Sequence, residues 1–140
     1  FSQVMQENER IMLDLLSAPK DSRCVFLTAS GTGAMEAAVM SVLAPAERVA
    51  VVNGGSFGQR FVDLCQLHGH TVDEIELEFG HQIARKNLED AVDLSCGTLL
   101  VNMHETSSGL LYDMSLLSDF CRERGMALIV DAVSVHRRRD

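Results

Sequence analysis

The stretch that decides the fold is Thr28-Ala29-Ser30-Gly31-Thr32-Gly33-Ala34-Met35-Glu36. It follows an apolar run, Cys24–Leu27, that is typical of a buried strand, and it leads into Ala34–Leu43, whose composition favours a helix. A strand, a Ser-Gly-Thr-Gly turn and a helix start together favour an anion site, because the free N–H groups and the dipole of the first helical turn attract negative charge. The sequence therefore predicts that Ser30, Gly31 and Thr32 hold a phosphate. The alternative is an ordinary helix N-cap by Ser30 or Thr32.

The composition restricts the class of protein. Of the 140 residues, 46% are hydrophobic and 23% charged, which is typical of a folded globular domain. The net charge of −8 argues against a nucleic-acid partner, and no apolar run is long enough to span a membrane. The four cysteines, Cys24, Cys65, Cys96 and Cys121, form no Cys-x-x-Cys pair and are expected to be reduced core thiols. These features predict a cytoplasmic protein with no nucleic-acid or membrane partner.

Helix and strand patterns alternate along the chain. Helices are expected at Ser2–Ser17, Ala34–Leu43, Phe57–Leu67, Asn87–Val92 and Met114–Arg124, and strands at Cys24–Thr28, Arg48–Val52, Thr71–Leu77, Thr98–Met103 and Ala127–Val130. Asp113 and Gly125 are expected to cap the last helix, and His104–Gly109 is expected to be a loop. Right-handed crossovers then predict an α/β fold, a mostly parallel sheet with helices on both faces, with Thr71–Leu77 near an edge.

Small or polar residues follow the major expected strands. They are Ser30-Gly31-Thr32, Asn53-Gly54-Gly55, His104-Glu105-Thr106-Ser107 and Asp131. Open α/β sheets bind their ligands beyond the carboxyl ends of the strands. The sequence therefore predicts a ligand site built from these four segments.

The residue types in these segments suit one kind of ligand. Asp131 follows four apolar residues, and a buried carboxylate needs a partner such as a protonated pyridine nitrogen. Phe57 offers an aromatic face to a planar ring, and Thr106 and Ser107 offer hydroxyl donors to a ring oxygen. Each residue also has a structural alternative: a helix cap or arginine partner for Asp131, a core position for Phe57, and turn caps for the two hydroxyls. Taken together, a phosphate, a flat ring and a pyridinium partner describe pyridoxal phosphate.

Other kinds of site find less support. The pair His68-x-His70 has no third metal ligand nearby, and the chain has no Gly-x-Ser-x-Gly motif and no P-loop lysine. A dinucleotide-binding domain needs an acid about 20 residues after its glycine turn, whereas the strand at Arg48–Val52 ends at Asn53. His104 is either an acid–base or stacking group or a loop histidine, and Glu105 is expected to orient its neighbours.

The chain also resembles a known family in four motifs. They are Ser30-Gly31-Thr32 with Ala34-Met35-Glu36, Asn53-Gly54-Gly55-Ser56-Phe57-Gly58-Gln59-Arg60, His104-Glu105-Thr106-Ser107-Ser108-Gly109, and Val130-Asp131-Ala132-Val133-Ser134. Their order and spacing resemble the large domain of class V, fold-type I pyridoxal-phosphate aminotransferases. That branch includes alanine/serine–glyoxylate and 2-aminoethylphosphonate–pyruvate transaminases.

The resemblance implies a role for each motif. Ser30, Gly31 and Thr32 would bind the cofactor phosphate, and Phe57 would stack on the pyridine ring. Thr106 would hydrogen-bond the ring hydroxyl, and Asp131 would keep the ring nitrogen protonated. The implied reaction is transamination between a small amino donor and a 2-oxo acid, and the implied assembly of the full-length protein is a homodimer.

The chain departs from the family in its lysines. The family needs a Schiff-base lysine, and the two lysines here, Lys20 and Lys86, do not follow a strand. The family's lysine would lie beyond Asp140, and the tail Val135-His136-Arg137-Arg138-Arg139-Asp140 differs from the family's usual continuation. We therefore expect residues 1–140 to be a single, partial cofactor-binding domain that is inactive alone. The alternative is a non-catalytic phosphate-binding module or a subunit-interaction fragment.

Overall fold

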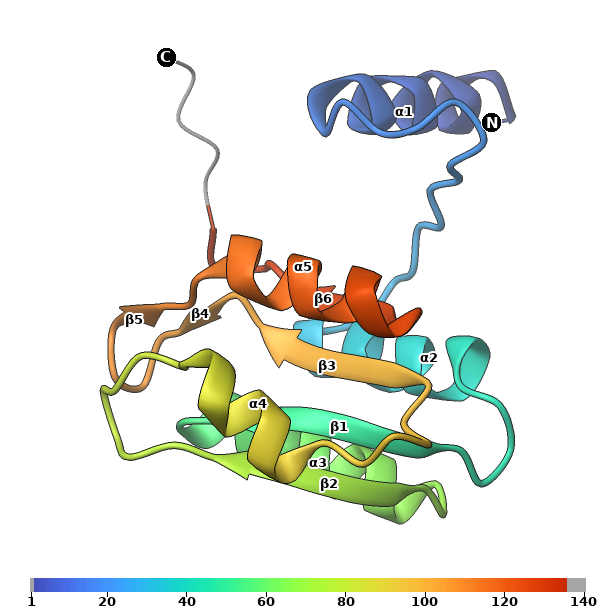
Figure 1. The fold of residues 1–140 in the computed structure, drawn as a ribbon. Coiled ribbons are helices and arrows are strands. Elements are labelled where there is room, and N and C mark those ends of the chain that lie inside the picture. The colour runs from blue at the N-terminus through green and yellow to red at the C-terminus, as the bar shows by residue number, and fades with distance from the viewer. Residues whose placement is uncertain (1, 136–140) are drawn as a thin grey trace. The chain divides into compact units, whose positions relative to one another are not determined.

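The computed structural model describes residues 2–135 (Figure 1). The chain divides between Ser30 and Gly31 into two compact units, and each is described here on its own. The basic cluster Arg137-Arg138-Arg139 lies outside the described residues.

The N-terminal unit is one helix and an extended segment. Helix α1, Ser2–Leu15, confirms the expected helix and has no buried residue. The expected strand at Cys24–Thr28 is wrong, because these residues form no strand and Val25 is 79% exposed. A strand needs a neighbour for its backbone N–H and C=O groups, and none of the described strands pairs with this segment. An apolar run alone does not reveal whether such a neighbour exists.

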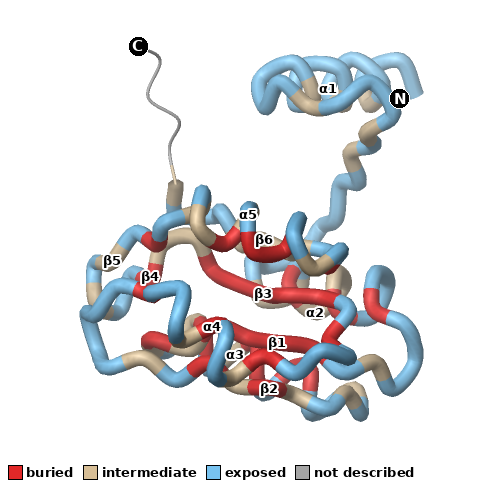
Figure 2. The backbone as a smooth tube through the Cα atoms, viewed as in Figure 1, coloured by how far each residue is buried: buried red, intermediate tan, exposed pale blue. Residues whose placement is uncertain are grey.

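The second unit is built on a four-stranded parallel sheet. Its strands are β1 (Arg48–Asn53), β2 (Thr71–Glu76), β3 (Thr98–Asn102) and β6 (Ala127–Asp131). Their order is β2-β1-β3-β6, and every neighbouring pair is parallel. The central strands β1 and β3 are almost wholly buried, as their apolar sequences require (Figure 2). The expected edge position of β2 is confirmed.

Helices cover both faces of the sheet. They are α2 (Gly31–Val42), α3 (Ser56–Leu67), α4 (Arg85–Ala91) and α5 (Met114–Arg124). Figure 1 shows α4 and α5 in front of the sheet and α2 and α3 behind it. Each face has its own core, because successive strand residues point to opposite sides: Ala50 and Val52 pack on one side, and Val49 and Val51 on the other. The predicted α/β class is confirmed.

The expected loop at His104–Gly109 is more ordered than predicted. His104–Glu105 forms strand β4, which pairs antiparallel with β5 at Leu110–Leu111. The turn between the two strands includes Gly109, whose φ of 74° lies in the left-handed region that glycine tolerates. A hydrogen bond from Tyr112 N to Met103 O (3.0 Å) extends the hairpin ladder one pair beyond His104 and Leu111.

Three of the four cysteines are core thiols, as the sequence predicts, whereas Cys24 is only half-buried. All four are free thiols, and Cys65, Cys96 and Cys121 are buried. Burial raises the pKa of Cys65 and Cys121 to about 11, so these thiols are neutral at physiological pH. No helix in the described part of the chain is long and apolar enough to cross a membrane.

Candidate functional site

Three strands of the sheet end together at one edge. Asn102 at the end of β3 pairs in register with Asp131 at the end of β6, and β1 ends level with them at Asn53. A hydrogen bond from Met103 N to Asp131 O (2.8 Å) continues the ladder between β3 and β6 past their last pair. The parallel sheet therefore brings the expected Asn53 and Asp131 segments to the same edge.

Helix α2 begins at the predicted phosphate turn. Its first residue is Gly31, three residues earlier than the sequence predicts, so Thr32 lies in the first helical turn. Ser30 directly precedes the helix, in the N-terminal unit. The first turn contains no acidic residue, so no side chain of the turn itself neutralises the positive end of the helix dipole.

Gly31 and Asp131 line the same pocket, which has a volume of about 280 Å³. Apart from Asp131, the lining is apolar or glycine: Gly31, Ala34, Met35, Ala38, Phe61, Ile129, Val130, Ala132 and Val133. The pocket therefore combines the start of a helix and a carboxylate within an otherwise apolar surface. These are two of the four segments that the sequence predicts to form one site.

Asp131 is less buried than the sequence predicts. Strand β6 is the last strand of the described sheet, so one of its edges is unpaired and Asp131 is only half-buried. Its Oδ1 accepts a hydrogen bond from Val133 N (3.0 Å), which fixes the carboxylate against the turn that follows β6. Within residues 2–135, Asp131 forms no ion pair, so the arginine-partner alternative has no support in the described part of the chain.

Phe57 lies in the first turn of α3 and is half-buried, so its ring is not enclosed in the core. The guanidinium carbon of Arg60, one turn further along α3, lies 4.9 Å from the ring centroid. The Phe57 N–H donates to Glu105 Oε2 (3.2 Å). The Phe57 ring therefore lies beside Arg60 of its own helix, while the Phe57 backbone is bound to Glu105 of strand β4.

Glu105 is the best-connected side chain near this edge, and it is completely buried. Its Oε2 accepts hydrogen bonds from Phe57 N, Gly58 N (3.1 Å) and Asn102 Nδ2 (3.1 Å). Its Oε1 accepts from both the backbone N–H (3.2 Å) and the hydroxyl (2.5 Å) of Ser107. The carboxylate thus joins the N-terminus of α3 to the β4–β5 hairpin.

The charge state of Glu105 follows from these bonds. Burial by itself would raise its pKa, but the hydrogen bonds from Ser107, Gly58 and Asn102 stabilise the carboxylate and outweigh burial. The pKa of Glu105 is therefore lowered below its usual range, and the side chain is ionised at neutral pH. A negative charge at the positive end of α3 is electrostatically favourable.

Two glycines allow the turn after β1 to lie this close to Glu105. A Cβ atom on Gly55 would overlap Ser107 Oγ and the Glu105 side chain, and one on Gly58 would lie 2.6 Å from Val52 O. Only glycine fits at either position without a shift of the surrounding backbone. Gly58 thus lets α3 lie close to β1, and Gly55 lets the turn lie close to the buried carboxylate.

Thr106 follows Glu105 and is exposed in the hairpin turn, so its predicted bond to a ring hydroxyl stays a prediction. Two buried polar atoms nearby, Asn102 Oδ1 and Tyr112 OH, have no hydrogen-bond partner among the described residues. Burial raises the pKa of Tyr112 to about 12, with a further contribution from the charge of Glu105.

The remaining candidates are separate from this edge. His68 Nε2 lies 3.0 Å from Glu36 Oε1, and no group of three metal-binding side chains occurs in residues 2–135. Lys86 lies on α4 with its side chain 81% exposed and paired to Asp90 (2.6 Å). That pairing raises the pKa of Lys86, which is unfavourable for a lysine that must react as a neutral amine.

The sequence analysis gave no role to Arg60 or Asn102, although both contact predicted site residues or their supports. Asn102 had a visible signal, since it is a polar residue ending an apolar strand. Arg60 also had one, because residues three apart on a helix share a face and Arg60 is three residues from Phe57.

Comparison with known proteins assigns the family. The parallel sheet with helices on both faces is the α/β fold of the fold-type I aminotransferase structures that the chain matches. The family model described as "Aminotransferase class-V" matches residues 1–140. The chain therefore belongs to the class-V aminotransferase family.

Two curated relatives are similar to most of this chain. The chain is similar to the soluble hydrogenase 42 kDa subunit of Anabaena cylindrica, with 33% identity over 81% of this chain and 31% of that protein. It is also similar to the 2-aminoethylphosphonate–pyruvate transaminase of Paraburkholderia phymatum, with 31% identity over 96% of this chain and 37% of that protein.

One solved structure, alanine–glyoxylate aminotransferase from Nostoc sp., matches with a TM-score of 0.68 and 30% identity over 74% of this chain and 28% of that one. The chain spans about a third of the length of the curated relatives it matches.

Proposed function

We propose that this chain forms part of a pyridoxal-phosphate cradle in an aminotransferase. In that protein it would serve transamination between a small amino donor and a 2-oxo acid of the pyruvate or glyoxylate type. The observation that carries the proposal is the pocket shared by Gly31 and Asp131, which offers helix N–H groups at one place and a carboxylate at another. A ligand with a phosphate and a protonated ring nitrogen has the two charges that such a pocket favours.

The residues present fit this cofactor. Gly31 and Thr32 stand at the start of α2, where the helix dipole favours an anion, and Thr32 adds a hydroxyl. Asp131 uses Oδ1 for Val133 N, and its carboxylate has no cationic partner within residues 2–135. Phe57 offers a half-buried ring and Thr106 an exposed hydroxyl.

Each of these residues would act by binding or by holding a proton. The N–H groups of α2 and the hydroxyls of Ser30 and Thr32 would bind the phosphate, and Phe57 would pack on the ring. Asp131 would hold a proton on the ring nitrogen, because the carboxylate stabilises the cationic form. When bound, the cofactor supplies an electron-withdrawing ring that stabilises negative charge at the substrate carbon.

A suitable test uses pyridoxamine 5′-phosphate, whose amine cannot react with Lys20 or Lys86. Calorimetric titration of the 140-residue chain should give saturable binding of this ligand. Pyridoxamine, which lacks the phosphate, should bind at least about tenfold more weakly, since charge-assisted hydrogen bonds contribute about 1.5–3 kcal/mol each. Absence of saturable binding up to millimolar ligand would contradict the proposal.

The chain alone is proposed to be inactive, because Lys86 is exposed and ion-paired and Lys20 precedes α2 in the N-terminal unit. Incubation with pyridoxal phosphate, alanine and glyoxylate should therefore give no turnover above the rate without protein. Turnover at an enzymatic rate would contradict this part of the proposal.

A second candidate is a subunit-interaction or non-catalytic binding fragment. It is favoured by the exposed apolar run Val25, Phe26 and Leu27, which is available to a partner surface. Phosphate-selective binding by a monomeric chain would contradict the interaction fragment, and binding only after mixing with a full-length subunit would favour it.

We further propose that the full-length protein is a cytoplasmic homodimer. The neutral buried thiols support a reducing compartment.

A further inference from the structure

Arg60 connects two residues that the proposed site needs. Its Nη1 donates a hydrogen bond to Thr32 Oγ1 (2.9 Å), across the interface between α3 and α2. The same guanidinium lies 4.9 Å from the centroid of the Phe57 ring. One side chain therefore contacts both the predicted phosphate turn and the predicted stacking ring.

The charge of Arg60 is placed unusually for a purely structural residue. Cations are favourable at helix C-termini and unfavourable at helix N-termini, yet this guanidinium contacts the first turn of α2. No acidic residue lies in that turn, and Arg60 forms no ion pair within the described residues. The cation and the helix dipole repel each other unless an anion lies between them or beside them.

The bonding geometry also distinguishes arginine from lysine here. The planar guanidinium donates from one nitrogen to Thr32 while its carbon lies near the Phe57 ring. A lysine ammonium would be a point charge with no planar group to lie against a ring. Both contacts together require the size and shape of arginine.

We propose that Arg60 is a positioning residue of the cofactor site, holding Thr32 and Phe57 in a fixed relative position and adding positive charge where the phosphate binds. This inference rests on the proposed function. It assigns a role to a residue outside the predicted set of Ser30, Gly31, Thr32, Phe57, Thr106 and Asp131.

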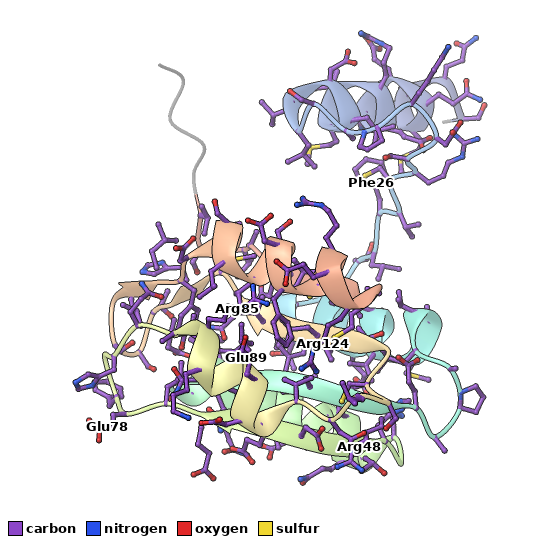
Figure 3. The ribbon with its side chains drawn as sticks, in the orientation of Figure 1. Phe26, Arg48, Glu78, Arg85, Glu89 and Arg124 are labelled. Atoms are coloured by element: carbon purple, nitrogen blue, oxygen red, sulfur yellow. The ribbon has the colours of Figure 1, made fainter. Side chains whose placement is uncertain are left out.

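The test compares Arg60→Met and Arg60→Lys with a matched control. Arg124, at the end of α5, also donates one hydrogen bond, to Val92 O (3.0 Å), and lies 4.7 Å from a phenylalanine ring, that of Phe120. Figure 3 shows Arg124 beside α5, on the face of the sheet opposite α2. Arg124→Met therefore removes an equivalent pair of contacts away from the proposed site.

The readout is the ratio of two dissociation constants, for pyridoxamine 5′-phosphate and for pyridoxamine. Arg60→Met should raise the dissociation constant of pyridoxamine 5′-phosphate about tenfold and that of pyridoxamine about twofold. The difference arises because the substitution removes a positive charge near the phosphate only. Arg60→Lys should recover part of the ratio, since it keeps the charge. Arg124→Met should leave the ratio unchanged. Equal weakening of both ligands by Arg60→Met would overturn the proposal.

Failure of the proposed function gives a different result. If the wild-type chain binds neither ligand, the claim that Arg60 holds Thr32 in position can still be tested. The test is a double-mutant cycle of Arg60→Met and Thr32→Val, measured by urea unfolding. The two substitutions should be coupled by at least about threefold in the unfolding equilibrium constant. Additive effects would overturn the proposal even then.

Discussion

Glu105 connects more of the site than any residue predicted to touch the cofactor. Its five hydrogen bonds reach α3, β3 and the hairpin turn, and none of its surface is exposed. Buried carboxylates are costly unless they are paired or fully hydrogen-bonded, and this one is fully hydrogen-bonded. Glu105 thus supports the backbone of Phe57 and the side chain of Ser107 in the hairpin turn.

The first prediction concerns this network. Glu105→Gln keeps the shape but places an amide N–H₂ group against N–H donors, so at least one donor loses its acceptor. We expect a loss of about 2 kcal/mol in the free energy of unfolding, measured by urea titration. The control is Glu78→Gln, at a side chain that is 85% exposed, which should change the free energy of unfolding by less than about 0.5 kcal/mol. An equal, small effect of both substitutions would contradict the account of Glu105.

The second prediction is the pH dependence of the unfolding free energy, compared between the wild type and Glu105→Gln. The pKa of Glu105 is lower in the folded state than in the unfolded state, so its ionisation stabilises the fold above the unfolded value, about 4.3. This contribution is lost as the pH falls through the folded-state pKa. The difference in unfolding free energy between wild type and Glu105→Gln should therefore be constant from about pH 6 to 8 and shrink below about pH 4. A difference that grows on acidification would contradict a lowered pKa of Glu105 in the folded state.

The sequence points to some candidate site residues and not to others for a physical reason. Asp131 stands where an apolar run meets a turn, and Gly31 lies in a Ser-Gly-Thr segment before a helix, so both are visible in the sequence as candidates, and their binding roles stay predictions. Arg60 and Asn102 act through contacts with segments 28 and three residues away, respectively. The residue types of both were visible in the sequence, but the Arg60–Thr32 contact depends on how α3 and α2 pack on the sheet, and a single sequence contains no direct record of that packing.

At the scale of elements, local chemistry decided which predictions succeeded. Helix α5 has the predicted limits because Asp113 accepts hydrogen bonds from Ser115 N and Leu116 N, and Gly125 ends the helix with a φ of 67°. The strand expected at Cys24–Thr28 failed because pairing depends on a distant partner. The start of α2 was placed too late because glycine was taken as part of a turn, whereas Gly31 begins the helix.

The third prediction follows from the capping of α5. Asp113→Ala removes the acceptor for two N–H groups at the start of the helix. We expect a loss of about 1 kcal/mol of stability by thermal or urea unfolding. Asp119→Ala, on the exposed side of the same helix, removes only an exposed ion pair with Arg122 and should change stability by less than about 0.5 kcal/mol. A larger effect at Asp119 would contradict the capping assignment.

At the scale of the whole molecule, the two units differ in their share of the core. The buried hydrophobic residues begin at Met35 and continue to Met126, and α1 has none. The core is thus contained in the unit that follows Ser30. The N-terminal unit instead exposes an apolar segment that includes Phe26 (Figure 3).

The fourth prediction follows from this division. A chain of residues 31–140 should fold, because every buried hydrophobic side chain of the described structure belongs to it. Its thermal unfolding, followed by circular dichroism, should be cooperative with a midpoint within about 5 °C of the full chain, as expected when less than about 1 kcal/mol is lost. Loss of cooperative unfolding would show that the first 30 residues contribute to the core.

The central claim is that the start of α2 and the end of β6 belong to one site that binds a phosphorylated pyridine. Its most direct test is a ¹H–¹⁵N NMR titration of the 140-residue chain with pyridoxamine 5′-phosphate. The account predicts that the backbone amides of Gly31, Thr32 and Val133 shift together with one dissociation constant, and that pyridoxamine moves Val133 more than Gly31. Saturable shifts confined to other segments, with these three amides unchanged, would contradict it.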